Sequence, residues 1–290
     1  MRAAGAAEFF DEGRMGVRVT PRVIDAWVNV NMSELGRPAW LEQVAKQYFK
    51  QGEDFFRDMS VAETVELMDS LGVDKAILTT DPERPSAHVL SFPKARPDRF
   101  FLGAQLDPRR AMKGLRALAT FCASEPVVLA RITPFAVDLP PTHPLYYPIY
   151  AKCIELGIAL TINTGIPGPP APAEVQDPLL LDRVCLHFPE LRLVMAHGAD
   201  PWWDVAIRLM IKYPNLSMMT SAYLPKYFPP QLVHFMNTRG RGKLMFASDH
   251  PAIPLRRCLE EAKALPLRPG VLEGFLYENA ERVLFGGEQG

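Results

Sequence analysis

Short apolar runs rich in β-branched residues recur along the chain and alternate with longer segments of helical periodicity. Eight runs have the length and composition of strands: Val23–Val28, Lys75–Thr79, Phe100–Ala104, Val127–Ile132, Ile158–Ile162, Arg192–Ala196, Asn215–Met219 and Lys243–Ala247. Most intervals between them predict helices: Val61–Leu71, Arg109–Ala123, Leu145–Leu156, Leu179–Phe188, Pro201–Lys212 and Leu255–Ala264. This alternation predicts βαβ units and parallel strands.

Eight such units in 290 residues fit a closed (β/α)8 TIM barrel better than an open doubly wound sheet. No GxGxxG or phosphate-binding loop follows the first strand, which removes the nucleotide signals of the open sheet. The long first interval holds WLEQVAKQYFKQGEDFF, which we interpret as a small helical insertion. Because no repeat or flexible linker is evident, we predict one domain over residues 1–290, with the barrel at about 20–286.

The composition narrows the class of protein. With 32 Lys and Arg against 33 Asp and Glu, the chain lacks the positive surplus of a general nucleic-acid binder. Its 28 prolines are roughly twice the usual share of about 5% and indicate rigid connections. The densest group, GIPGPPAPA at 165–173, predicts a stiff loop over a pocket. A ligand for a proline-recognising partner is the alternative.

The first residues and the cysteines bear on location. Acidic residues interrupt the segment Met1–Arg14, so we expect no secretory signal, and no apolar run reaches the length of a membrane span. The four cysteines form no CxxC pair and lie in predicted helices: Cys122, Cys153, Cys185 and Cys258. We expect buried free thiols in a cytoplasmic protein with no membrane or nucleic-acid partner.

The carboxyl ends of the strands are where barrels of this kind carry their chemistry. His197 and Asp249 each end an apolar strand, and they are our candidate catalytic residues. A rim histidine bonded to backbone carbonyls is the alternative for His197. For Asp249, capping of the following helix is equally favoured by the sequence alone.

Other polar and aromatic residues at the strand ends form a candidate substrate-binding set. Asn29 and Asn163 either orient a substrate carbonyl or tie down their own loops. Arg131 either binds a substrate carboxylate or pairs with a buried acid such as Asp25, and the pairing is slightly favoured. The complete set is Trp27, Asn29, Arg131, Asn163, Tyr223 and His250.

Several segments together resemble the amidohydrolase superfamily, in its amidohydrolase-2 branch of decarboxylases, hydratases and lactonases. They are IDAWVNV, ELGIALTINTG, FPELRLVMAHG, KYPNLSMMTSAY, KLMFASDHP and YENAERVLF. The resemblance runs from about Val23 to Phe285, and it implies a (β/α)8 barrel, a small-molecule substrate and a homodimer.

This sequence departs from the metal-binding motif of that branch. The branch opens with I-D-x-H-x-H, and its two histidines are replaced by Trp27 and Asn29, while a further histidine is replaced by Asn163. Only His197 and Asp249 match. Because catalytic zinc usually has three protein ligands, the resemblance implies no tightly bound metal cofactor. A loosely held divalent metal such as zinc on His197 and Asp249 is the alternative.

Three functions are consistent with a site in which only His197 and Asp249 match the motif. The first is hydrolysis of a lactone or similar activated carbonyl compound, with Asp249 as general base and His197 polarising the carbonyl or orienting the water. The second is a non-catalytic subunit that assembles with a related barrel or another enzyme. The third is a metal-dependent hydrolase or decarboxylase with an atypical ligand set.

Overall fold

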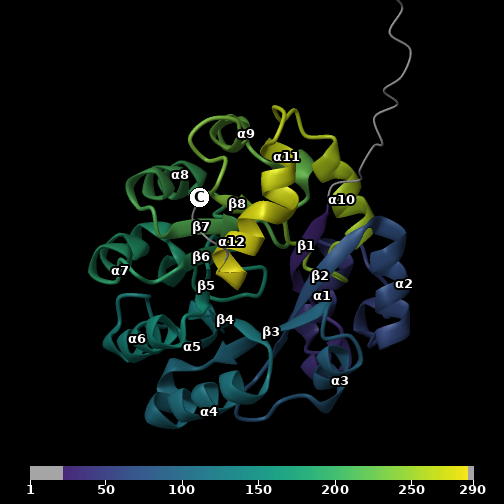
Figure 1. Cartoon of the computed structure of the whole chain (residues 1–290), viewed down its shortest axis with the longest axis horizontal. Coiled ribbons are helices and arrows are strands. Elements are labelled where there is room, and N and C mark those ends of the chain that lie inside the picture. The colour runs from purple at the N-terminus through teal and green to yellow at the C-terminus, as the bar shows by residue number, and fades with distance from the viewer. Residues whose placement is uncertain (1–21, 287–290) are drawn as a thin grey trace, which may run out of the picture.

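Eight parallel strands form the centre of the molecule, in the order of the sequence. The computed structural model describes residues 22–286; the expectation about a secretory signal concerns residues outside this range. The strands are β1 Val23–Val28, β2 Val73–Thr80, β3 Phe100–Leu106, β4 Val127–Ile132, β5 Ala159–Asn163, β6 Leu193–Ala196, β7 Leu216–Met219 and β8 Leu244–Met245. Backbone bonds such as Ala26 N to Phe246 O (3.2 Å) and Asn29 N to His250 O (2.8 Å) join β8 to β1. The (β/α)8 barrel is confirmed (Figure 1).

Helices surround the strands and end close to where the sequence predicts. They are α1 Ala39–Gln47, α2 Val61–Leu71, α3 Ala87–Ala95, α4 Ala111–Ser124, α5 Pro134–Val137, α6 Tyr147–Leu156, α7 Leu181–His187, α8 Trp203–Lys212, α9 Pro230–Met236, α10 Leu255–Lys263, α11 Val271–Glu273 and α12 Asn279–Phe285. Helix α2 begins at a capping box between Ser60 and Glu63 and ends at Gly72 in the left-handed conformation. The four cysteines are free and lie on α4, α6, α7 and α10, as predicted, but only three of them are buried and Cys122 is half-buried.

The barrel interior is apolar at its amino end and closed there by α12. Ile24, Leu129 and Val194 belong to an interior cluster that also contains Val283 and Leu284 of α12. Figure 1 shows α12 lying across the strands. Because this end is plugged by apolar side chains, the site must open at the other end, where the strands end.

The insertion between β1 and β2 covers part of that other end. It contains the turn η1 Met32–Leu35, helix α1 and the turn η2 Glu53–Phe56, as its aromatic stretch predicts. Its apolar side chains pack around Ala252, which follows β8. The proline-rich segment after β5 has no helix or strand over residues 164–173. A Cβ at Gly168 would lie 3.9 Å from Val44 of α1, so this segment meets the insertion over the barrel.

Candidate active site

Asp25 fixes the place where β1 and β8 meet. Its carboxylate is fully buried and accepts hydrogen bonds from the backbone N–H of Ser248 (2.9 Å), the Ser248 hydroxyl and the N–H of Trp27 (3.2 Å). Burial raises the pKa of Asp25 to about 6, although the bonds from Ser248 lower it. Trp27 and Asp249 leave the barrel directly beside this anchor, so Asp25 sets their relative position.

The indole of Trp27 lies between a cation and an imidazole. The guanidinium carbon of Arg131 is 3.3 Å from the centroid of the indole, and the ring centroids of Trp27 and His197 are 4.4 Å apart. A cation stacked on an indole is stabilised by the electrons of the ring face. Trp27, Arg131 and His197, which come from three different strands, are thus brought together as predicted for a site at the strand ends.

Arg131 crosses the inside of the barrel. Its side chain is 1% exposed, and its Nη2 donates to the carbonyl of Ala26 (3.0 Å). A Cβ at position 103 would lie 2.8 Å from Arg131 Nε, so Gly103 provides the room for the side chain. Among the described residues, Arg131 Nε and Nη1 have no hydrogen-bond partner. Burial lowers the pKa of Arg131 to about 9, and the carboxylates of Asp249 and Asp25 raise it.

The expected pairing of Arg131 with Asp25 is wrong. Within residues 22–286, no ion pair or hydrogen bond joins the two side chains, and Asp25 bonds to Ser248 instead. The sequence favoured the pairing because a buried cation usually needs a partner. Here the indole of Trp27 and one backbone carbonyl stabilise the guanidinium.

Asp249 stands at the end of β8 with one side-chain partner. Asn29 Nδ2 donates to Asp249 Oδ1 (2.9 Å) and to the carbonyl of His250 (3.1 Å). Burial raises the pKa of Asp249 to about 7, while the bond from Asn29 and the charge of Arg131 lower it. The helix that follows, α10, has Pro254 at its N-cap, so the capping interpretation of Asp249 is wrong.

His197 is held by its backbone and keeps a neutral ring. Its φ is 64°, and its N–H donates to the hydroxyl of Ser221 (3.1 Å). Burial, reinforced by the positive charge of Arg131, lowers its pKa to about 4. Its Nδ1 has no hydrogen-bond partner among the described residues. The alternative of a ring bonded to backbone carbonyls therefore has no support.

The remaining candidates lie in different surroundings. Asn163 ends β5 as a buried residue, 8% exposed. The ring of His250 turns away to the thioether of Met59, 3.1 Å from Nε2. Tyr223 packs edge-on against Trp203, with ring centroids 5.4 Å apart. Binding of substrate by these three residues stays a prediction.

The donor set does not suit a tightly held catalytic metal. Trp27 has only an N–H donor, and Asn29, whose Nδ2 donates to Asp249, offers only a neutral amide oxygen. Within the described range, no group of three or more His, Cys, Asp or Glu side chains is placed to hold a metal ion. The guanidinium of Arg131 adds a positive charge that opposes a dication. His197 and Asp249 therefore have no third ligand of these types beside them among the described residues.

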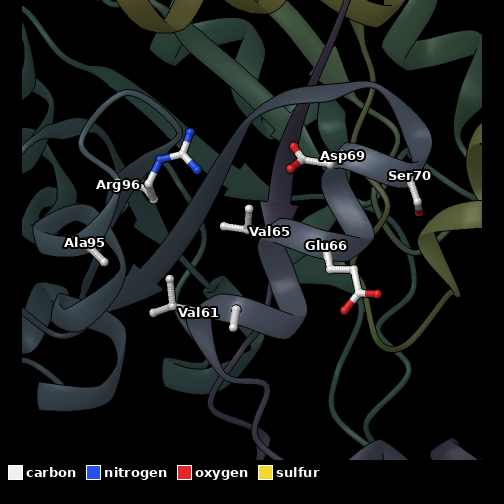
Figure 2. A pocket seen from close by; sticks show the side chains of 8 residues that line it. Val61, Val65, Glu66, Asp69, Ser70, Ala95 and Arg96 are labelled. Carbon is white, nitrogen blue, oxygen red and sulfur yellow. The ribbon is translucent and has the colours of Figure 1, made fainter.

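Two hollows accompany the barrel. One lies on the outer surface between α2 and the end of α3, lined by Val61, Val65 and Arg96 (Figure 2). Its lining residues come from α2 and from the end of α3, outside the strands of the barrel. The other, of about 460 Å³, lies at the carboxyl ends of β2, β3 and β4, where Gln105 and Thr133 line it. Only the second belongs to the catalytic end of the barrel.

Comparison with known proteins decides the family. A family model described as amidohydrolase matches residues 24–286. The chain belongs to the amidohydrolase family. The resemblance seen in the sequence is thereby confirmed over nearly the whole barrel. A search of curated protein sequences found no match.

Solved structures show how this amidohydrolase compares in fold. An uncharacterized TIM-barrel protein from Bordetella bronchiseptica is 23% identical with a TM-score of 0.75, over 91% of this chain and 98% of that one. The 5-carboxyvanillate decarboxylase of Sphingomonas paucimobilis is 18% identical with a TM-score of 0.70, over 92% and 99%. A probable 2-pyrone-4,6-dicarboxylic acid hydrolase from Acinetobacter baumannii is 14% identical with a TM-score of 0.60, over 91% and 99%.

These likenesses establish the fold of the amidohydrolase. Two further decarboxylases of similar fold, from Novosphingobium aromaticivorans and Polaromonas, have bound manganese. A divalent metal is thus bound in some structures of similar fold. In the part of the chain that the structure describes, no helix is long and apolar enough to cross a membrane.

Sequence reasoning missed several residues that shape the site. Ser248 and Ser221 hold the turns that carry Asp249 and His197, and Gly103 makes room for Arg131. The available signal was a serine directly before the strand-end aspartate and a glycine inside an apolar strand. Neither signal identifies its partner, because the contacts span different strands.

Proposed function

We propose that this amidohydrolase hydrolyses a lactone or a similarly activated carbonyl compound without a tightly bound catalytic metal, and that Asp249 is the general base. The observation that carries the proposal is the environment of the Asp249 carboxylate. It is held by Asn29 and has a pKa of about 7. A general base works best when its pKa lies near the working pH, so this carboxylate suits proton abstraction at neutral pH.

The reaction needs one water and one reversible proton transfer. The water oxygen bonds to the carbonyl carbon while a proton moves from the water to Asp249, and the electron pair of the C=O bond moves to the carbonyl oxygen. When this intermediate collapses, the C–O bond to the leaving alkoxide breaks. The leaving oxygen takes the proton from Asp249, which returns to the carboxylate. One water is added across the ester bond.

The oxyanion needs stabilisation that the neighbouring residues can supply. His197 is neutral at pH 7, so its ring can donate one hydrogen bond to the developing oxyanion. Arg131 contributes a fixed positive charge, with Nε and Nη1 unpaired among the described residues. Trp27 covers both groups. Such interactions act more strongly where water is excluded.

Similarity in fold supports the choice of substrate class. One structural neighbour is named as a probable hydrolase of a pyrone, and a 2-pyrone is a cyclic ester. Activated esters of this kind need less help from a catalyst than amides. A lone carboxylate base therefore suffices for them in the proposed mechanism, where a metal-bound water would otherwise supply the nucleophile.

A second candidate is a non-catalytic subunit that assembles with a related barrel. The packing of Trp27 between Arg131 and His197 favours it, because the indole fills space at the mouth. Retention of a part-buried Asp249 with a shifted pKa opposes it, since a carboxylate without function would be replaced at little cost.

The test is hydrolysis of a panel of five- and six-membered lactones by chelator-treated protein whose metal content is measured. We expect turnover of at least one lactone by the metal-free protein, and at least about a hundredfold loss in Asp249→Asn. Asp204→Asn, which changes an exposed acid on α8, is the matched control and should behave as the wild type. Turnover that depends on added metal would assign the metal-dependent alternative. Full activity of Asp249→Asn would refute the role of the base.

A further inference from the structure

We propose that the cavity at the ends of β2, β3 and β4 binds a carboxylate group of the substrate. The cavity of about 460 Å³ is lined by the basic residues Arg84, Arg109, Arg110 and Lys113 together with Gln105 and Thr133. This proposal rests on the proposed function for the reacting end of the substrate. It adds that the substrate is an anionic compound whose carboxylate is separate from the carbonyl that reacts.

Two residues that line the cavity, Gln105 and Thr133, lie on the strand faces that point into the barrel. Gln105 pairs with Arg131 in the register of β3 and β4. Gln105 and Thr133 each lie two residues beyond Gly103 and Arg131, and side chains two apart on a strand share a face. Thr133 therefore lies one inward-facing position, about 7 Å along the strand, beyond Arg131, and Gln105 lies beside Arg131 in the register. The cavity and the buried charge of Arg131 thus lie at the same end of the barrel.

The acids of the cavity leave a surplus of positive charge. Glu83 is shared by Arg110 (2.5 Å) and Lys113 (3.1 Å). Arg109 pairs with Asp107 (2.8 Å), and Arg84 lies 3.6 Å from Asp81. Four cations against three carboxylates give 4 − 3 = +1, while the whole chain has a net charge of −1. A single carboxylate would neutralise this surplus.

The donors needed to hold a carboxylate are within the lining. The Lys113 side chain is 72% exposed and has three N–H donors, of which Glu83 takes one. The contact from Gln105 Nε2 to Thr133 Oγ1 is long, at 3.4 Å, so this amide can turn to a ligand at little cost. Charge-assisted and neutral donors of this kind together recognise a carboxylate. A neutral group would accept weaker bonds from these donors, and both a neutral and a cationic group would leave the surplus charge uncompensated.

The binding test uses glutarate, a dicarboxylate that has no ester bond, and glutaramide, its neutral counterpart, in calorimetric titrations of the wild-type protein. We expect glutarate to bind and glutaramide to bind at least about tenfold more weakly. Lys113→Glu should weaken glutarate binding at least about tenfold, and Arg109→Gln should weaken it to a smaller extent. Arg116→Glu is the matched control, because it makes the same change of charge on α4 outside the cavity; it should bind glutarate within about twofold of the wild type.

The outcomes separate this proposal from the proposed function. Asp249→Asn should lose turnover and keep glutarate binding, since the base lies outside the cavity. Equal affinity in wild type and Lys113→Glu, or equal affinity for glutarate and glutaramide, would overturn the carboxylate site. So would the absence of glutarate binding at about 20 mM. These titrations are decisive even if no lactone is hydrolysed, because they measure binding alone.

Discussion

Two carboxylates at the same end of the barrel have opposite environments. Asp249, after β8, has one amide donor, and burial raises its pKa to about 7. Glu83, after β2, accepts bonds from Arg110 and Lys113, and these lower its pKa to about 2. The same chemical group is thus a proton acceptor on one side of the mouth and a permanent anion on the other.

The contrast explains how one opening can serve two purposes. The side formed by β1, β6 and β8 keeps Asp249 and His197 near the protonation states that chemistry at neutral pH requires. The side formed by β2, β3 and β4 keeps its charges paired and hydrated, which suits recognition of an anion. Arg131 lies between them and contributes charge to the reacting side.

Arg131→Met should have the largest effect on the side of the mouth that carries Asp249 and His197. Without the guanidinium, the developing oxyanion loses its fixed positive charge, so kcat/KM for lactone hydrolysis should fall at least about a hundredfold. The fold should persist, because an apolar chain of similar length replaces a buried cation. Steady-state kinetics with thermal unfolding measures both. Unchanged turnover in a folded variant would remove Arg131 from the mechanism, and Arg116→Met controls for loss of a surface charge.

Gly103→Ala should disturb the position of the Arg131 guanidinium from the neighbouring strand β3. The added Cβ would lie 2.8 Å from Arg131 Nε and from Leu129 Cδ1, so the arginine must shift. We expect a loss of about 1–3 kcal/mol in the free energy of unfolding and about a tenfold loss of kcat/KM. Denaturant titration and kinetics test this result. Wild-type kinetics combined with lower stability would show that the position of Arg131 is not critical.

Asp249→Asn should stabilise the protein at high pH. The folded pKa of Asp249 is raised from 3.8 to about 7, so its favourable contribution is complete below pH 3.8 and is lost as the pH rises through 7. Asparagine removes the buried charge and still accepts a bond from Asn29. The variant should be more stable by on the order of 2 kcal/mol at pH 8 and similar to the wild type at pH 4. Equal stability at both pH values would contradict the raised pKa.

Glu83→Gln should have a small effect on anion binding at the side formed by β2, β3 and β4. Removing this carboxylate leaves Arg110 and Lys113 without their shared acid and raises the charge of the cavity. Glutarate should bind about threefold more tightly at low salt, and the gain should shrink at high salt because exposed charges are screened. Weaker binding at every salt concentration would show that Glu83 orders the cavity instead of competing with the ligand.

The sequence predicted the barrel well because its signals are local. Apolar runs and helical periodicity place β1 and α2 at the predicted residues. Strand β8 is shorter than predicted, since Phe246 and its neighbours bond to β1 and to Phe275 outside a regular ladder. Which residues lie at the strand ends followed from the same pattern.

The arrangement within the site was not predictable in the same way. The stacking of Arg131 on Trp27 and the bonds of Asp25 to Ser248 join residues more than a hundred positions apart. They depend on barrel closure and on the register of β1, which is irregular between Asp25 and Val28. The expectation that a buried cation pairs with a buried acid therefore gave the wrong partner for Arg131.

The pH dependence of kcat/KM for lactone hydrolysis by metal-free protein tests the central claim most directly. The base acts as its carboxylate, so the rate constant should rise with pH, with a midpoint near 7, and remain level above it. His197, with a pKa of about 4, should add no change across this range. A profile without an inflection near 7, or hydrolysis that appears only after a divalent metal is restored, would contradict Asp249 as a metal-independent general base.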